Sequence, residues 1–273
     1  MAWKQNIIED FKQLVSFDSI SFHERNTADW LLARLKSIGF SVEEDQAGAY
    51  YGGDTGNIFA VLDGELEGDP VIFCAHMDVV EPGSGKKYVL EKDGTIHSAG
   101  DTVLGADDIS GILEILYGVQ LVLDSGKPHK KIEILFTIGE ELYVKGSDVF
   151  DYSKVTAKQA YVLDLSEETT FNIGTIQGGT ATNIVPDCCV LTAYETPLES
   201  KSVTDFQKAC EILGFSGGLT GTFGGSDNNS FAKNGIEGLV LSNGMYNAHS
   251  TREYTTVDDL YKGAELIGQL ILL

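Results

Sequence analysis

The stretch VIFCAHMDVV, residues 71–80, decides the fold class because it joins a short apolar run directly to a histidine and an aspartate. A short apolar run of this kind is typical of a buried strand in a sheet that is covered on both faces. In open α/β sheets, ligands bind at the carboxyl ends of the strands. His76 and Asp78 therefore lie where we expect a functional site.

The sequence on either side of this stretch alternates between apolar runs and amphipathic segments. We predict further strands at 57–62, 132–138, 160–165 and 238–242. We predict helices at 7–15, 30–38, 108–123, 202–214 and 257–273, each with an apolar stripe at helical spacing. This alternation predicts an α/β three-layer sandwich, with a mixed, mainly parallel sheet and helices on both faces.

Composition narrows the class of protein. The 273 residues include 41 acidic and 19 basic side chains, a net charge of −22, which disfavours nucleic acids and anionic membranes as partners. No apolar run reaches the roughly 18 residues of a membrane span, and the first residues lack a signal-peptide core. Four scattered cysteines do not make a disulfide framework. We therefore expect a cytoplasmic protein.

Titratable residues recur where the predicted strands end. Besides His76, they are Asp107, Glu140, Glu141, Asp164 and His249. Taken singly, each has an ordinary structural explanation, such as a helix N-cap, a solvated helix start or a satisfied histidine. Taken together, several buried carboxylates at one sheet edge require a compensating cation, because an unpaired buried charge costs several kcal/mol.

The ligand types indicate which cation. Imidazole and carboxylate without thiolate suit Zn²⁺, with Co²⁺ or Mn²⁺ as alternatives. Asp78 is placed to accept the second imidazole N–H of His76 and to fix its tautomer. The adjacent glutamates suit a division of labour in which one binds metal and the other is the general base.

The chain resembles the peptidase T branch of the co-catalytic zinc exopeptidases, which also include aminoacylases and other deacylating enzymes. Several motifs carry the resemblance in order along nearly the whole chain. They are AHMDVV (75–80), LGADDISGI (104–112), GEE (139–141), Asp164, GTIQGGTATNIVPD (174–187), GGSDNNSF (224–231) and NAHSTREY (247–254).

The resemblance implies a role for each candidate residue. Asp107 bridges two divalent metals, which the resemblance implies are zinc, and the peptide bond to Asp108 is cis. His76 and Asp164 complete one metal site, while Glu141 and His249 complete the other. Glu140 is the general base, and Asp78 orients His76. Asn183, Ser226 and Asp227 are implied substrate contacts.

The chain departs from the family in length. These enzymes carry a lid domain of roughly a hundred residues between the Asp164-type ligand and the GGSD segment. Here we expect a catalytic domain of residues 1–165 and 198–273, with a lid reduced to a β hairpin at 166–197. The lid histidine that stabilises the oxyanion in dimeric relatives has no counterpart. The exposed strands of the hairpin are a candidate contact for a homodimer.

The function that we predict is a two-metal aminopeptidase or tripeptidase acting on short peptides. Two alternatives stay open. The same site serves an N-acyl amino acid deacylase, and the missing lid is compatible with a metal-binding remnant of impaired activity.

Overall fold

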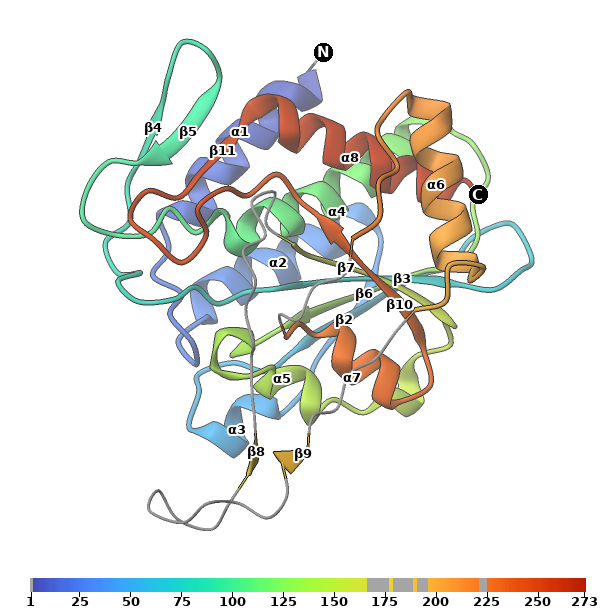
Figure 1. Cartoon of the computed structure of the whole chain (residues 1–273), viewed down its shortest axis with the longest axis horizontal. Coiled ribbons are helices and arrows are strands. Elements are labelled where there is room, and N and C mark those ends of the chain that lie inside the picture. Colours follow the sequence, from blue (N-terminus) through green and yellow to red (C-terminus); the bar gives the residue numbers. More distant parts are fainter. Residues whose placement is uncertain (1, 166–176, 179–188, 191–195, 221–224) are drawn as a thin grey trace.

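The computed structural model describes residues 2–165, 177–178, 189–190, 196–220 and 225–273. At its centre is a six-stranded sheet in the order β1-β2-β6-β3-β7-β10 (Figure 1). Strands β6, β3, β7 and β10 are parallel to one another, whereas β2 is antiparallel to both β1 and β6. The bounds are β1 Ser41–Glu44, β2 Ile58–Leu62, β3 Val71–His76, β6 Ile132–Thr137, β7 Gln159–Leu165 and β10 Glu237–Ser242. The predicted mixed, mainly parallel sheet is confirmed.

Two separate cores form because side chains alternate across the sheet. In β3, Phe73 and Ala75 enter the larger core, whereas Ile72 and Cys74 enter the smaller one on the opposite face. Helices therefore cover both faces, as predicted (Figure 1). The larger core takes side chains from α1 (Ala2–Val15), α2 (Arg25–Ile38), α4 (Ala106–Ser125), α6 (Lys201–Leu213) and α8 (Val257–Ile271). The smaller core includes Phe231 of α7 (Asn228–Lys233) and Phe150, which follows α5 (Lys145–Asp148).

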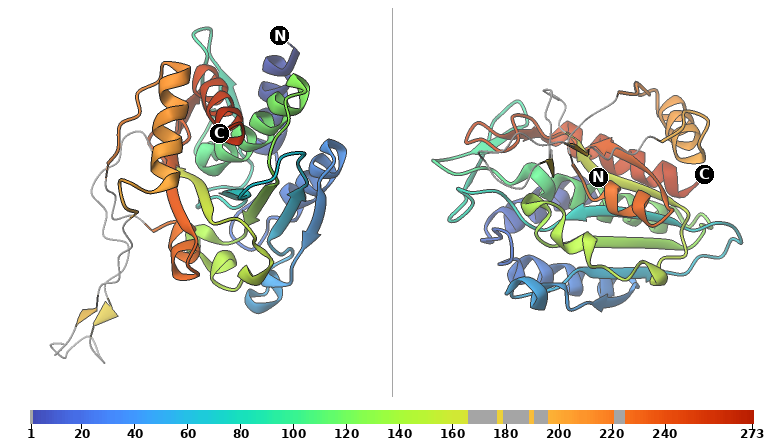
Figure 2. Two further views of the ribbon diagram at one scale, coloured as in Figure 1. Left: turned by 90° about the vertical axis from the view of Figure 1, so that its right-hand side faces the viewer. Right: turned by 60° about the horizontal axis from the view of Figure 1, so that its bottom comes forward.

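The first and last helices meet on the larger core. The rings of Trp3 and Tyr261 pack edge to face with centroids 5.4 Å apart, and the Tyr261 hydroxyl donates to the main-chain carbonyl of Lys4 at 3.0 Å. Figure 2 shows α6 beside α8 on this same face. The predicted closing helix is confirmed, and it ties the two ends of the described chain to one core.

Several short elements escaped prediction because they are too short to show a hydrophobic period. They include a second sheet in the order β11-β5-β4, made of β4 (Tyr88–Leu90), β5 (Thr95–Ser98) and β11 (Tyr254–Thr256). The others are α3 (Ala47–Tyr51), α5, α7, and the 3₁₀ turns η1 (Glu140–Leu142) and η2 (Tyr152–Lys154). Two of them shape the site, since η1 carries both glutamates and β11 follows the loop of His249.

Most of the predicted lid hairpin, 166–197, lies outside the described residues. Of its strands, β8 (Gln177–Gly178) and β9 (Cys189–Val190) are described, and they pair antiparallel. Asn183 also lies outside the described residues. Across the described part of the chain, no helix combines the length and apolar character that crossing a membrane requires.

Candidate metal centre

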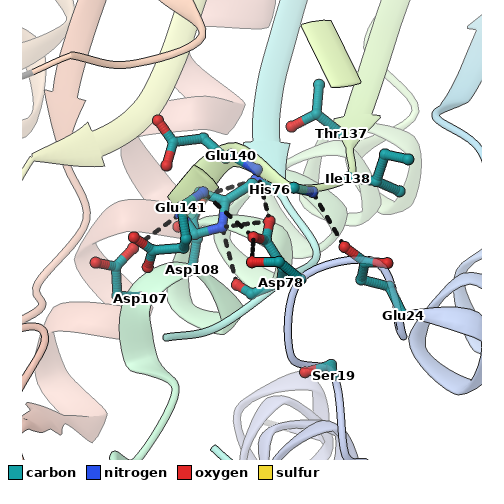
Figure 3. Close-up of polar contacts among 12 residues, drawn as sticks. Ser19, Glu24, His76, Asp78, Asp107, Asp108, Thr137, Ile138, Glu140 and Glu141 are labelled. Carbon is teal, nitrogen blue, oxygen red and sulfur yellow. Dashed lines mark hydrogen bonds and ion pairs between the residues drawn. The ribbon is translucent and has the colours of Figure 1, made fainter. Parts of the chain in front are cut away.

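The six residues predicted to form the site come from five separate segments. His76 ends β3, Asp107 lies at the start of α4, and Glu140 and Glu141 form η1 directly after β6. Asp164 is the penultimate residue of β7, and His249 lies in the loop between β10 and β11. Figure 3 shows Asp107, Glu140 and Glu141 around His76. These positions are grouped because the carboxyl ends of parallel strands share one edge of the sheet.

The carboxylate of Asp107 lies between the two histidines. Its Oδ1 is 2.9 Å from His76 Nε2, and its Oδ2 is 3.0 Å from His249 Nε2. Glu141 lies on the second side, with Oε2 at 3.0 Å from His249 Nε2. On the first side, the ligand atoms of His76, Glu140 and Asp164 all lie within 4.8 Å of one another. A second group of ligand atoms within the same distance comes from His76, Asp107 and Glu141, so the two groups have His76 in common and Asp107 contacts both histidines.

Burial and mutual repulsion raise the pKa of three acids in this cluster. Burial, reinforced by the charge of Asp164, raises the pKa of Glu140 well above its ordinary value. Burial and the charge of Asp107 raise the pKa of both Asp164 and Glu141. Without another cation, this edge of the sheet concentrates more negative charge than its surroundings stabilise.

The pKa shifts of Asp107 and of the two histidines favour the charged form of each group instead. Burial opposes ionisation of Asp107, but hydrogen bonds with His249 and His76 hold its pKa below the usual range. Hydrogen bonds with Asp107 and Glu141 raise the pKa of His249 to about 11. Burial alone would lower the pKa of His76, yet its bonds to Asp107 and Asp78 raise it. Asp107 is thus the acid in this cluster that is held ionised.

The donor set fits divalent metal ions. It combines imidazole nitrogens with carboxylate oxygens and contains no thiolate, which suits zinc and its first-row neighbours. Oε1 of Glu141 is buried and has no hydrogen-bond partner among the described residues. An ionised oxygen left in this state is costly unless a cation binds it. The residues present therefore fit a divalent metal ion, which would bind the carboxylate oxygen that the protein itself leaves without a partner.

Asp78 forms hydrogen bonds with His76 and with the main chain of both glutamates. Its carboxylate accepts the main-chain N–H of Glu140 at 2.9 Å and that of Glu141 at 3.2 Å, and it also accepts the Ser21 hydroxyl at 2.6 Å. The nearer acceptor for His76 Nδ1 is the main-chain carbonyl of Asp78, at 2.9 Å, while a carboxylate oxygen lies at 3.5 Å (Figure 3). Asp78 thus contacts His76 through two groups rather than the carboxylate alone.

Asp108, for which the sequence analysis gave only the cis peptide bond, performs a similar role. Its carboxylate accepts the main-chain N–H of His76 at 3.0 Å, that of Gly111 at 3.1 Å, and the side-chain amide of Asn243 at 2.6 Å. The peptide bond between Asp107 and Asp108 is cis, as the resemblance implied. Asp108 therefore joins the end of β3 to the start of α4.

Two further buried glutamates hold loops that carry candidate ligands. Glu253 accepts three main-chain N–H groups in the segment 104–107, and Glu24 accepts the N–H of Gly139 at 3.0 Å, next to Glu140. Burial raises the pKa of Glu253 to about 7 and that of Glu24 to about 8, the latter with a contribution from Asp78. The only sequence signal for Glu253 was its place in NAHSTREY, and Glu24 had none.

The predicted substrate contacts that are described lie inside the protein. Ser226 is buried, and its hydroxyl accepts the main-chain N–H of Asn228 at 3.3 Å. Asp227 is 1% exposed and accepts hydrogen bonds from the Thr137 hydroxyl and the Cys74 thiol. Their assignment to substrate binding remains a prediction.

Comparison with known proteins identifies relatives across the chain. Residues 72–273 match the model of peptidase family M20/M25/M40. The uncharacterised protein YqjE of Bacillus subtilis is 26% identical over 367 aligned positions, which cover 99% of both chains. The alignment is longer than this chain (367 positions against 273 residues), so YqjE carries at least 94 residues that this chain lacks.

A curated peptidase T and a solved aminopeptidase are also similar. Peptidase T of Clostridium acetobutylicum is 31% identical over 206 residues, which cover 59% of this chain and 48% of that protein. The chain thus spans about half the length of this relative. The crystal structure of aminopeptidase PepT from Bacillus cereus superposes with a TM-score of 0.86 at 25% identity, and the match covers 98% of each chain.

Proposed function

Because this chain belongs to peptidase family M20/M25/M40, we propose that it is an aminopeptidase or tripeptidase that hydrolyses short peptides, with two metal ions as its cofactor. It is a metallopeptidase of the peptidase T-like kind. Beyond family membership, we propose the number of metal ions, the general base and the class of substrate. The native metal that we propose is zinc, with cobalt or manganese as alternatives.

The observation that carries the proposal is the position of Asp107 between two histidines. One oxygen faces His76 and the other faces His249, at 2.9 and 3.0 Å. A carboxylate with one oxygen directed to each half is suited to hold one metal on each side. In this assignment His76 and Asp164 complete one site, and Glu141 and His249 complete the other.

Two such ions, when bound, supply Lewis acidity toward the scissile carbonyl and lower the pKa of the attacking water. The protein supplies the proton transfers. Glu140 is 9% exposed, Asp78 accepts its main-chain N–H, and its carboxylate lies beside the ligand atoms of His76 and Asp164. In the proposed mechanism Glu140 accepts a proton from water and passes it to the leaving amine.

We also propose that residues 166–197 are a reduced lid, set between catalytic segments 1–165 and 198–273. The 94 or more additional residues of YqjE support a large internal difference in length. A homodimer through the hairpin strands belongs to the same proposal, as does a location in the cytoplasm. A reduced lid leaves no counterpart of the oxyanion histidine, and removal of one oxyanion donor from an enzyme costs roughly 10²–10³ in rate.

The test combines turnover and metal content in one sample. Protein reconstituted with zinc, cobalt or manganese is assayed on di- and tripeptides with free amino termini and on N-acyl amino acids, and bound metal is quantified. We expect about two metals per chain and cleavage of the free peptides. Cleavage of the N-acyl amino acids alone would identify a deacylase. Two metals without turnover would support the impaired remnant, and absence of metal would refute the assignment.

A further inference from the structure

Glu253 places a buried carboxylate against the segment that carries Asp107. Its Oε2 accepts the main-chain N–H groups of Leu104 and Gly105 at 2.7 and 2.8 Å. Its Oε1 accepts the N–H of Asp107 itself at 2.8 Å. The residue is 1% exposed, so these three bonds are shielded from water. Bonds from main-chain N–H groups to an ionised acceptor are among the stronger hydrogen bonds in proteins.

Glu253 is itself held firmly. The next residue, Tyr254, begins β11 and pairs with His97 of β5. The main-chain groups of Tyr254 and Tyr246 also exchange hydrogen bonds of 2.9 and 3.1 Å, and their rings stack with centroids 4.6 Å apart. The loop closed by this pairing contains His249. The carboxylate therefore connects the loop of one histidine to the main chain of the acid that the two histidines share.

We propose that Glu253 is a positioning residue for the metal centre: it fixes the main chain of Asp107 so that one carboxylate oxygen faces each half of the site. The inference rests on the proposed two-metal function and assigns no contact between Glu253 and metal or substrate. Partners of this kind fix the orientation of ligands, and their loss typically costs about 10–100-fold in metal affinity.

The geometry requires a carboxylate rather than an amide. Three N–H donors face the two oxygens, so both oxygens must accept. In Glu253→Gln, the amide oxygen is best placed against the Leu104 and Gly105 pair. Its NH₂ group then faces the N–H of Asp107, donor against donor. The variant has nearly the shape of the natural residue but removes the bond at the bridging acid.

Glu133 offers a matched control. It is also 1% exposed, and it also accepts main-chain N–H groups, those of Thr156 and Ala157, at 3.1 Å each. It lies near the beginning of β6, at the opposite end of the strand from Glu140. Glu133 also accepts the Thr156 hydroxyl. Glu133→Gln therefore makes the same carboxylate-to-amide change at a buried acceptor of main-chain N–H groups, but away from the metal centre.

The experiment measures zinc affinity of the full chain by competition with a chromophoric chelator, for the natural protein, E253Q and E133Q. The melting temperature of each metal-free protein reports the cost to the fold. The visible spectrum of the cobalt-loaded protein reports ligand geometry, which a merely structural role would leave unchanged. We expect E253Q to bind zinc about 10–100-fold more weakly and to alter the cobalt spectrum. We expect E133Q to retain both natural values.

The outcomes separate this inference from the proposed function. Natural affinity and spectrum in E253Q, or equal losses in E253Q and E133Q, would overturn the positioning role. Zinc binding without peptide cleavage by the natural protein would refute only the proposed reaction, because affinity still decides the role of Glu253. A natural protein that binds no zinc would remove the metal centre and the inference with it. If E253Q does not fold, Glu253→Asp, too short to reach all three donors, takes its place.

Discussion

The two ends of the central sheet use the same hydrogen-bond chemistry for different purposes. At the amino end of β6, the carboxylate of Glu133 accepts N–H groups from Thr156 and Ala157 and fixes the loop before β7. At the carboxyl end, Glu253, Asp78 and Asp108 accept N–H groups in the same way. A buried acid that captures main-chain donors is therefore a structural device of this fold and does not by itself mark a site.

The difference lies in what remains unsatisfied. At the carboxyl end, one oxygen each of Glu24, Glu141 and Asp227 is buried without a hydrogen-bond partner among the described residues. Both oxygens of Glu133 have partners. Burial raises the pKa of all three, and Glu141 alone of the three belongs to a candidate ligand group. Its unsatisfied oxygen is destabilising when ionised and is therefore suited to bind a cation. Substitutions at the two ends of the sheet should therefore differ in their effects on metal binding, catalysis and stability.

The largest effect is expected from Asp107→Asn, because this residue faces both histidines. We expect loss of both metals and peptide hydrolysis no faster than that of the metal-free protein. Elemental analysis after dialysis and a peptide assay measure the two effects. Glu141→Gln is the comparison, since it touches one half of the site, and one metal should remain. Retention of both metals in Asp107→Asn would contradict a shared ligand.

Glu140→Gln should separate chemistry from binding at the same edge. The variant keeps its shape and the main-chain bond to Asp78 but loses the proton acceptor, so we expect kcat to fall about 10²–10⁴-fold. Metal content should not change. Steady-state kinetics on a tripeptide and metal analysis of the same sample test this. Loss of metal together with activity would instead make Glu140 a ligand.

The candidate ligands could be predicted because they follow patterns that a sequence displays. A buried strand is an apolar run, and His76 and Asp164 stand at the ends of such runs, while Glu140 and Glu141 follow one. Parallel strands then bring these ends to one edge without any knowledge of distances. The main elements of the fold were predictable for the same reason, since long amphipathic helices and apolar strands have clear periods.

The supporting residues could not be predicted, because their role depends on contacts distant in sequence. Glu253 binds N–H groups 146 to 149 residues away, and Glu24 binds Gly139 at a separation of 115. A main-chain donor is the same for every residue type except proline, so neither partner leaves a mark in the sequence. The burial of Asp227 was equally hidden, since an aspartate at a helix start is expected at the surface.

Glu24 should make the stability of the metal-free protein depend on pH. Burial raises its pKa from 4.5 to about 8. The folded protein thus retains a proton that the unfolded chain releases, and this contribution to stability is full below pH 4.5 and is lost as pH rises through 8. At about 1.4 kcal/mol per pKa unit, the loss amounts to at most about 5 kcal/mol.

Glu24→Gln should remove this dependence, because the amide is neutral at every pH and can still accept the N–H groups of Phe22 and Gly139 through its oxygen. We expect the variant and the natural protein to have similar free energies of unfolding near pH 5. Above pH 7 the variant should be the more stable. Denaturant titrations in EDTA from pH 5 to 8.5 measure the difference, and a difference independent of pH would disprove it.

The smallest effect is expected at the satisfied end of the sheet. Glu133→Gln can donate its NH₂ group to the Thr156 hydroxyl while its oxygen accepts the N–H groups of Thr156 and Ala157, so the free energy of unfolding should fall by only about 0.5–1.5 kcal/mol. Metal content and kcat should not change, since Glu133 and the metal centre lie at opposite ends of β6. Denaturant titration with a parallel peptide assay measures both. A fall in kcat at natural metal content would mean that the two ends of the sheet are coupled through β6, and the contrast drawn between them would then fail.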